Sequence, residues 1–246
     1  MGSLHSWELV TAVDGPGTRL TFFLAGCALR CQYCQNPDTW KITYGRPTDI
    51  SEVTARIDRY ARVLKAAGGG VTVSGGEPML QLAFLRRILQ YCKQIGLHTA
   101  VDTSGYLGAR ADDSFLDLVD LFLLDIKSGI AETYKKVTER ELQPTLDFSQ
   151  RLALRQKKIW IRFVLVPDLT DAVENVEAVA DHVVRIQELS GGVSVERVEV
   201  LPFHQMGRSK WDELGMSYPL EDAQPPSVEL VERVRNQFRA RGLKVY

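Results

Sequence analysis

Residues 20–25 read LTFFLA, and this short apolar run opens a series that determines the fold. The later runs are 70–74 (GVTVS), 98–102 (HTAVD), 121–125 (LFLLD), 159–166 (IWIRFVLV) and 195–201 (VERVEVL). Several of them are apolar nearly throughout, which is typical of strands buried on both faces of a parallel sheet. The chain is therefore expected to contain six such strands.

Segments with helical periodicity separate these runs, near residues 48–66, 79–95, 112–119, 145–157, 172–189 and 226–241. Strands that alternate with helices predict a parallel sheet with right-handed crossovers. Six units are too few for a complete eight-stranded barrel. We therefore predict an α/β fold, a partial (β/α)6 barrel of the TIM type, with a doubly wound open sheet as the alternative. Both folds place active sites at the carboxyl ends of the strands.

Composition and charge exclude several classes of protein. A chain of 246 residues can form one core, and we expect a single domain over residues 1–246. The 30 basic and 31 acidic residues leave a net charge of −1, without the basic excess of a general nucleic-acid binder. The sequence shows neither a membrane-length apolar run nor a secretory signal. We expect a cytoplasmic protein with no nucleic-acid or membrane partner, and a monomer as the default.

Three cysteines follow the first run with the spacing Cys-x3-Cys-x2-Cys, namely Cys27, Cys31 and Cys34. Such spacing indicates a metal, a cluster or redox chemistry. Structural zinc takes four ligands, whereas Cys92 lies on the apolar stripe of a predicted helix and is expected in the core. Three local thiolates suit a [4Fe–4S] cluster with one iron left open. A zinc-binding interaction module is the alternative from another class of protein.

Two further strand ends carry glycines or carboxylates. Gly75-Gly76-Glu77 follows the second run, where adjacent glycines allow close approach of a ligand and the carboxylate can receive an ammonium group. A plain turn into a helix is the other interpretation. Asp102-Thr103 and Asp125-Ile126-Lys127 follow the next two runs. Their aspartates are either helix caps or oxygen ligands of a hard cation.

The last two runs add a buried cation and a histidine. Arg162 lies inside an apolar run, where a charge without a partner is costly. It predicts either a buried ion pair or a clamp on a ligand carboxylate. His204 follows the sixth run. Because all of these residues follow strands of one sheet, we expect an active site at its carboxyl edge.

At this point the motifs resemble a known family. The cysteine motif, with Tyr33 before its last cysteine, resembles the signature of the radical S-adenosylmethionine superfamily, and Gly75-Gly76-Glu77 resembles its second motif. Asp14-Gly15-Pro16-Gly17-x-Arg19 resembles the glycyl-radical-enzyme activases. Further matches to their formate-lyase branch are Leu201-Pro202-Phe203-His204-x-x-Gly207, Lys210-Trp211 and Pro225-Pro226. The resemblance covers essentially the whole chain.

The resemblance implies two cofactors and a set of site residues. Cys27, Cys31 and Cys34 would hold three irons of a [4Fe–4S] cluster, and S-adenosylmethionine would bind the fourth. Glu77, with Gly75 and Gly76, would receive the methionine ammonium group. The rest of S-adenosylmethionine would contact Tyr33, Cys34, Gln35, Asp125, Ile126, Lys127, Arg162 and His204. A monovalent cation, Na⁺ or K⁺, would be held by Asp102, Thr103, Asp125 and the carbonyl of Leu123.

The implied reaction is reductive cleavage of S-adenosylmethionine with an electron from flavodoxin or ferredoxin. The 5′-deoxyadenosyl radical would then take a hydrogen from a glycine of pyruvate formate-lyase. Gln35 stands where formate-lyase activases often have histidine, so this position hydrogen-bonds but does not titrate near neutral pH. Apart from the three motif cysteines, the chain has only Cys92, which cannot bind a second cluster alone. We therefore expect no ferredoxin-like insert. The alternative is a radical enzyme with a different substrate. That substrate is either another glycyl-radical enzyme or a small molecule, as for a deazapurine-forming synthase.

Overall fold

The six predicted strands are all present in the structure, a computed structural model that describes residues 1–11 and 13–246. They are β2 (Arg19–Leu24), β4 (Gly70–Gly75), β5 (His98–Thr103), β6 (Leu121–Asp125), β7 (Lys158–Leu165) and β8 (Val195–Pro202). β2 pairs with β4, β4 with β5, and β7 with β8, each time in parallel. β2, β4 and β6 are buried along nearly their whole length, as their apolar sequences predict.

Two strands lie outside the predicted set. β1 (Gly2–Thr11) pairs antiparallel with β2, and β3 (Arg46–Thr48) pairs antiparallel with β1. β1 mixes polar and apolar residues, and β3 has only 3 residues with Pro47 at its centre. Neither contains the apolar run that identifies the other strands, and proline is tolerated in β3 because this strand lies at the edge of the sheet.

The hydrogen-bonded strands follow the order β3-β1-β2-β4-β5-β6-β7-β8. The two ends of this order are different strands, so the sheet is open rather than closed. The predicted α/β fold, with a mostly parallel sheet that does not complete a barrel, is confirmed.

The chain divides into two units, which are described separately. The first comprises Met1–Ala28, Thr39–Thr103 and Leu107–Leu123. The second comprises Leu29–Asp38, Ser104–Tyr106 and Leu124–Tyr246. The expectation of one domain over residues 1–246 stays a prediction.

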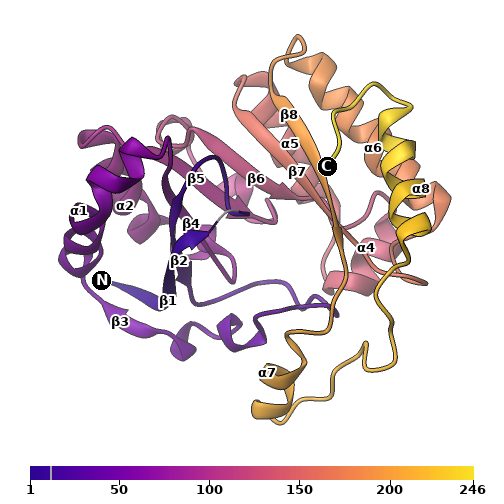
Figure 1. Cartoon of the computed structure of the whole chain (residues 1–246), viewed down its shortest axis with the longest axis horizontal. Coiled ribbons are helices and arrows are strands. Elements are labelled where there is room, and N and C mark those ends of the chain that lie inside the picture. Colours follow the sequence, from indigo (N-terminus) through magenta and orange to yellow (C-terminus); the bar gives the residue numbers. More distant parts are fainter. Residues whose placement is uncertain (12) are drawn as a thin grey trace. The chain divides into compact units, whose positions relative to one another are not determined.

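In the first unit, helices α1 (Ile50–Ala66) and α2 (Leu82–Gln94) contact one another and the strands β2, β4 and β5 (Figure 1). α1 begins with a capping box in which Asp49 and Glu52 satisfy each other's backbone N–H groups. The apolar stripe of α2 is buried as predicted, and Cys92 is fully buried within it. Cys92 is therefore a core residue, and its burial raises the pKa of the thiol to about 12. The helix predicted over residues 112–119 is a single turn, α3 (Asp113–Leu116).

In the second unit, α5 (Gln143–Leu154) contacts β7, and α6 (Val173–Leu189) and α8 (Val228–Arg239) contact β8 (Figure 1). The rings of Phe163 on β7 and Phe238 on α8 have centroids 6.1 Å apart in the core of this unit. Two short helices were not predicted, α4 (Ala131–Thr138) and α7 (Arg208–Glu213). Among the helices in the described parts of the chain, none is long and apolar enough to cross a membrane.

Residues 244–246 extend the sheet beyond β8. Val198 N–H donates to the carbonyl of Lys244 at 2.8 Å, and Tyr246 N–H donates back to the carbonyl of Val198 at 2.9 Å. The guanidinium of Arg197 on β8 lies 3.2 Å from the ring centroid of Trp160 and 5.0 Å from that of Tyr246. These contacts cover the free side of β8 with the chain's own last residues.

Arg19 is fully buried at the start of β2, where it ends the Asp14–Arg19 motif. Its guanidinium donates to the carbonyl of Val71 at 2.6 Å and to Thr72 Oγ1 at 2.9 Å. Thr72 Oγ1 in turn donates to the carbonyl of Asp14 at 2.6 Å, which ties the turn to β4. Burial lowers the pKa of Arg19 to about 10. The motif therefore has a structural role at the amino-terminal end of the parallel strands.

We expect Arg19→Met to lower the free energy of unfolding by about 2–4 kcal/mol, because Val71 and Thr72 would lose buried hydrogen-bond donors. Arg62→Met, an exposed position on α1, is the control and should change it by less than about 0.5 kcal/mol. Urea denaturation followed by circular dichroism measures both. Equal midpoints for the two variants would contradict the role given to Arg19.

His182 on α6 is a second buried titratable group. Its Nε2 lies 2.6 Å from Ser149 Oγ on α5, and the residue is 6% exposed. Burial, together with the charge of Arg185, lowers the pKa of His182 from 6.5 to about 4. The folded protein therefore keeps this ring neutral at pH values where the unfolded chain binds a proton.

This difference predicts acid destabilisation through His182. As the pH falls from 6.5 towards 4, the free energy of unfolding should decrease by roughly 3 kcal/mol in total, because the unfolded state takes up a proton that the folded state excludes. His182→Gln should lack this part of the pH dependence. Chemical denaturation at several pH values compares the two proteins, and identical slopes in this range would contradict the assignment.

Candidate active site

Cys27 follows β2 directly and belongs to the first unit. Gly26 before it has a φ of +97°, a conformation that favours glycine. Gly26 N–H donates to the carbonyl of Thr39 at 2.6 Å, and Cys27 N–H donates to the carbonyl of Trp40 at 3.0 Å. These bonds fix the backbone of Cys27, whose side chain is partly exposed.

The second motif is joined directly to this segment. Gly76 N–H donates to the carbonyl of Leu24 at 2.9 Å, and Glu77 N–H donates to the carbonyl of Gly26 at 2.8 Å. A Cβ atom on Gly75 would lie 2.2 Å from the Leu24 oxygen, and one on Gly76 would lie 2.4 Å from the Gly26 oxygen. Both glycines are therefore required for the two backbone segments to approach each other.

Glu77 is 1% exposed, and its carboxylate has a fixed orientation. Its Oε1 accepts from Met79 N–H at 3.1 Å, which caps the short 3-10 helix η3 (Pro78–Gln81), and from Thr103 Oγ1 at 2.7 Å. The motif does turn into a short helix, as its other interpretation expected, and the Glu77 carboxylate caps that helix through Met79. The bond to Thr103 at the end of β5 is an additional contact that capping does not need.

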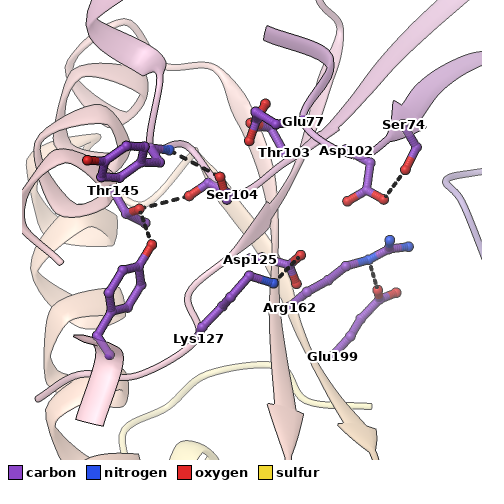
Figure 2. Close-up of polar contacts among 12 residues, drawn as sticks. Ser74, Glu77, Asp102, Thr103, Ser104, Asp125, Lys127, Thr145, Arg162 and Glu199 are labelled. Carbon is purple, nitrogen blue, oxygen red and sulfur yellow. Dashed lines mark hydrogen bonds and ion pairs between the residues drawn. The ribbon is translucent and has the colours of Figure 1, made fainter. Parts of the chain in front are cut away.

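The predicted cation ligands of the first unit lie on two neighbouring strands, Asp102 and Thr103 at the end of β5 and Leu123 in the middle of β6. Asp102 Oδ2 accepts from Ser74 Oγ at 2.7 Å, so the ends of β4 and β5 are linked (Figure 2). Thr103 follows Asp102, and Leu123 on β6 is fully buried. Asp125, the remaining predicted ligand, belongs to the second unit.

Cys31 and Cys34 lie in the second unit, on a loop of little regular structure. Cys34 N–H donates to the carbonyl of Cys31 at 3.0 Å, so the two cysteines end one turn. Cys31 is buried and Cys34 is partly exposed. Within residues 1–11 and 13–246, no three His, Cys, Asp or Glu side chains form a group that could hold a metal ion. The three-thiol ligand set therefore stays a prediction.

Gln35 connects the cysteine loop to residues 204–218, here called the clamp segment. Its Nε2 donates to the carbonyl of His204 at 2.9 Å, and its Oε1 accepts from Gly207 N–H at 2.7 Å. A Cβ atom on Gly207 would lie 2.7 Å from Gln35 Cα, so this contact requires glycine. The Gln35 amide donates one of these bonds and accepts the other without a change of protonation. Glutamine at this position, in place of histidine, therefore has a structural role.

Trp211 and Lys210 of the clamp segment hold the same loop further along. Trp211 Nε1 donates to the carbonyl of Cys34 at 2.9 Å, and Lys210 Nζ donates to Asn36 Oδ1 at 2.7 Å. The ring of Tyr218 lies 5.3 Å from that of Trp211. Burial, with the charge of Cys34, raises the pKa of Tyr218 to about 12.

Lys127, Asp125 and Tyr33 form a buried polar group in the second unit. Lys127 Nζ lies 3.0 Å from Asp125 Oδ2 and 5.6 Å from the ring centroid of Tyr33 (Figure 2 shows the first pair). Burial by itself would lower the pKa of Lys127, but Asp125, Tyr33 and Cys31 hold it well above its ordinary value. Burial raises the pKa of Tyr33 well above its usual range. Tyr33 Oη is buried and has no hydrogen-bond partner among the residues that the structure describes.

The loop after β6 is held by Asn175, which sequence reasoning missed. Ser128 Oγ donates to Asn175 Oδ1 at 2.6 Å, and Gly129 N–H donates to the same oxygen at 3.0 Å. Ile126 N–H donates to the carbonyl of Arg162 at 3.0 Å, which continues the link to β7. Asn175 is 1% exposed near the start of α6, and a buried asparagine inside an apolar helix is the signal that could have found it.

Arg162 is held in a buried ion pair, which was one of its two interpretations. Its Nε lies 3.1 Å from Glu199 Oε2, and Arg197 contacts the other oxygen of Glu199 at 2.5 Å (Figure 2 shows Arg162 and Glu199). Arg162 and Glu199 are paired residues of β7 and β8. Arg197 and Glu199 alternate with apolar residues along β8, and this period of two could have placed them on one face.

Comparisons with known proteins agree with the motifs. The family described as a 4Fe-4S single cluster domain matches residues 13–143. The pyruvate formate-lyase-activating enzyme of Listeria monocytogenes is 42% identical over 237 residues, which are 94% of this chain and 93% of that protein. The pyruvate formate-lyase 1-activating enzyme of Escherichia coli is 36% identical over 249 residues, covering 100% of this chain and 98% of that protein.

Two solved structures are also similar. A domain of pyruvate-formate lyase-activating enzyme from Bacteroides vulgatus has a TM-score of 0.57 at 26% identity, covering 72% of this chain and 98% of that one. SuiB from Streptococcus suis bound to S-adenosylmethionine has a TM-score of 0.64 at 15% identity, covering 92% of this chain and 50% of that one, which shows a shared fold. With relatives of 36–42% identity over nearly its whole length, the chain belongs to the pyruvate formate-lyase-activating enzyme family.

Proposed function

We propose that this chain activates pyruvate formate-lyase by generating a glycyl radical on it, with a [4Fe–4S] cluster and S-adenosylmethionine as cofactors. The observation that carries the proposal is the near full-length identity to enzymes named for that activity. The 4Fe-4S domain match over residues 13–143 contains all three motif cysteines. The family model therefore supports the cluster independently of the relatives' names.

The residues present fit the two cofactors. Cys27, Cys31 and Cys34 would supply three thiolate ligands, which is the donor chemistry of an iron–sulfur cluster with one open iron. The buried hydroxyl of Tyr33 has no partner in the described part of the chain, which is consistent with a partner that arrives with a bound group. When bound, the cluster and S-adenosylmethionine supply the one-electron chemistry that ends in removal of hydrogen from a glycine.

The chain's own residues position the cofactor and exclude water. We assign Glu77, with Gly75 and Gly76, to the methionine ammonium group, because Thr103 and Met79 hold the Glu77 carboxylate in one orientation. Tyr33, Cys34, Gln35, Asp125, Ile126, Lys127, Arg162 and His204 are proposed to contact the rest of the cofactor. Asp125 keeps Lys127 protonated, and Glu199 holds Arg162. A site lined by such buried groups protects a radical reaction from solvent.

Several finer assignments are part of the same proposal. Asp102, Thr103, Asp125 and the Leu123 carbonyl are proposed to bind a monovalent cation, Na⁺ or K⁺. Flavodoxin or ferredoxin is proposed as the electron donor. We further propose that the chain acts in the cytoplasm as a monomer, with residues 1–246 forming one radical S-adenosylmethionine domain, and that it binds neither nucleic acid nor membrane.

The cysteine assignment predicts the effect of two matched substitutions. Cys31→Ala should abolish assembly of the cluster, because a loop thiolate ligand is lost. Cys92→Ala is the control, since Cys92 is a buried core thiol on α2. Iron and sulfide analysis after anaerobic reconstitution should give about four of each per chain for the control and almost none for Cys31→Ala. A full cluster in Cys31→Ala would refute the ligand set, and one bound zinc in the wild type would refute the cluster.

The function itself is tested by electron paramagnetic resonance. We expect an anaerobic mixture of reconstituted protein, reductant, S-adenosylmethionine and pyruvate formate-lyase to show a glycyl-radical doublet on the lyase. The same mixture without S-adenosylmethionine is the control and should show none. If the cluster signal changes with S-adenosylmethionine but no doublet forms, pyruvate formate-lyase is not the substrate.

A further inference from the structure

Tyr218 lies in the clamp segment, a few residues after α7, and is 5% exposed. Its ring is packed on Trp211, with centroids 5.3 Å apart and an interplanar angle of 53°. The other end of the Trp211 indole donates to the carbonyl of Cys34 at 2.9 Å. Trp211 therefore connects Tyr218 to the last cysteine of the motif.

The Tyr218 hydroxyl is buried and lacks a hydrogen-bond partner within the described ranges, residues 1–11 and 13–246. Buried hydroxyl groups in native proteins are nearly always paired, because an unpaired one loses its hydration without compensation. Tyr218 packs on Trp211, whose indole N–H bonds the carbonyl of Cys34, so all three residues belong to one cluster. The Tyr218 hydroxyl lacks an acceptor among the described residues of that cluster.

We propose that Tyr218 Oη donates a hydrogen bond to sulfur at the Cys34 side of the bound cluster, either the Cys34 thiolate or a neighbouring sulfide. This inference rests on the proposed function, since it needs the cluster. Sulfur is an acceptor, and the protonated phenol of Tyr218 is a donor without an acceptor among the described residues. No covalent change is involved, and Tyr218 keeps its proton.

Such a bond makes the cluster easier to reduce. Reduction adds negative charge to the cluster, and a hydrogen bond to its sulfur is stronger in the more negative state. Tyr218 would therefore raise the reduction potential of the cluster. Trp211 bonds the backbone of Cys34 and packs on the ring of Tyr218, so the fold holds both residues in place.

The test compares Tyr218→Phe with the wild type and with Tyr134→Phe. Tyr134 is a matched control because it is fully buried in the same unit, and its hydroxyl is paired with Thr145 Oγ1 at 3.0 Å. After anaerobic reconstitution, iron and sulfide content is determined, and the reduction potential is measured by titration monitored with electron paramagnetic resonance, without S-adenosylmethionine.

We expect Tyr218→Phe to keep its cluster but to have a more negative reduction potential. The expected shift is about 59 mV, which corresponds to a tenfold loss in the equilibrium constant of a one-electron reduction. Tyr134→Phe should keep the wild-type potential. The melting temperatures of the cluster-free proteins should show the opposite pattern. Tyr134→Phe should melt at a lower temperature than the wild type, because it loses a buried hydrogen bond. Tyr218→Phe should melt at the wild-type temperature, because it removes only an unpaired hydroxyl.

Two results would overturn the inference. One is a wild-type potential in Tyr218→Phe with full cluster content. The other is a lowered melting temperature of cluster-free Tyr218→Phe, which would mean that the hydroxyl has a protein partner. Failure of the wild type to assemble any cluster is a different result, and it would refute the proposed function instead.

Discussion

The close approach of two backbone segments, Leu24–Gly26 and Gly75–Glu77, is the constraint on which the first unit's part of the site depends. The carbonyls of Leu24 and Gly26 accept from the N–H groups of Gly76 and Glu77, and no Cβ atom fits at either glycine of the second motif. The same contact sets the backbone beside Cys27 and the position of the Glu77 carboxylate. Two motifs that are about fifty residues apart in sequence are thus one structural element.

In the second unit, the loop with Cys31 and Cys34 has little regular structure of its own, so other residues must hold its shape. Its support comes from residues far along the chain. Gln35 bonds to His204 and Gly207, and Trp211 bonds to the backbone of Cys34. Side-chain bonds to another segment give this loop a defined shape. The loop need not be a strand, in which successive side chains point to opposite faces.

The six buried strands, the stripe of α2 and the core position of Cys92 were predictable because they follow from local periodicity and apolar content. β1 and β3 were not, since their pairing partners rather than their own residues make them strands. The positions of Glu77, Asp102 and Asp125 at or just after strand ends were predictable from the same runs, whereas their roles at a ligand stay a prediction. For the supporting residues Asn175 and Glu199, local patterns indicate only that they are unusual; their partners, Ser128 and Arg162, are distant in sequence and were not predictable. The unpaired state of the Tyr218 hydroxyl depends on burial, which no short segment of sequence reveals.

The contact of residues 244–246 with β8 has a consequence for behaviour in solution. An exposed strand edge offers unpaired N–H and carbonyl groups to any other chain, which makes it a site of intermolecular association. Here Lys244 and Tyr246 pair with Val198, and the guanidinium of Arg197 lies near the rings of Trp160 and Tyr246. Residues 244–246 thus protect this edge from fibril-like stacking, and a variant in which they cannot pair with β8 would expose the edge to other chains.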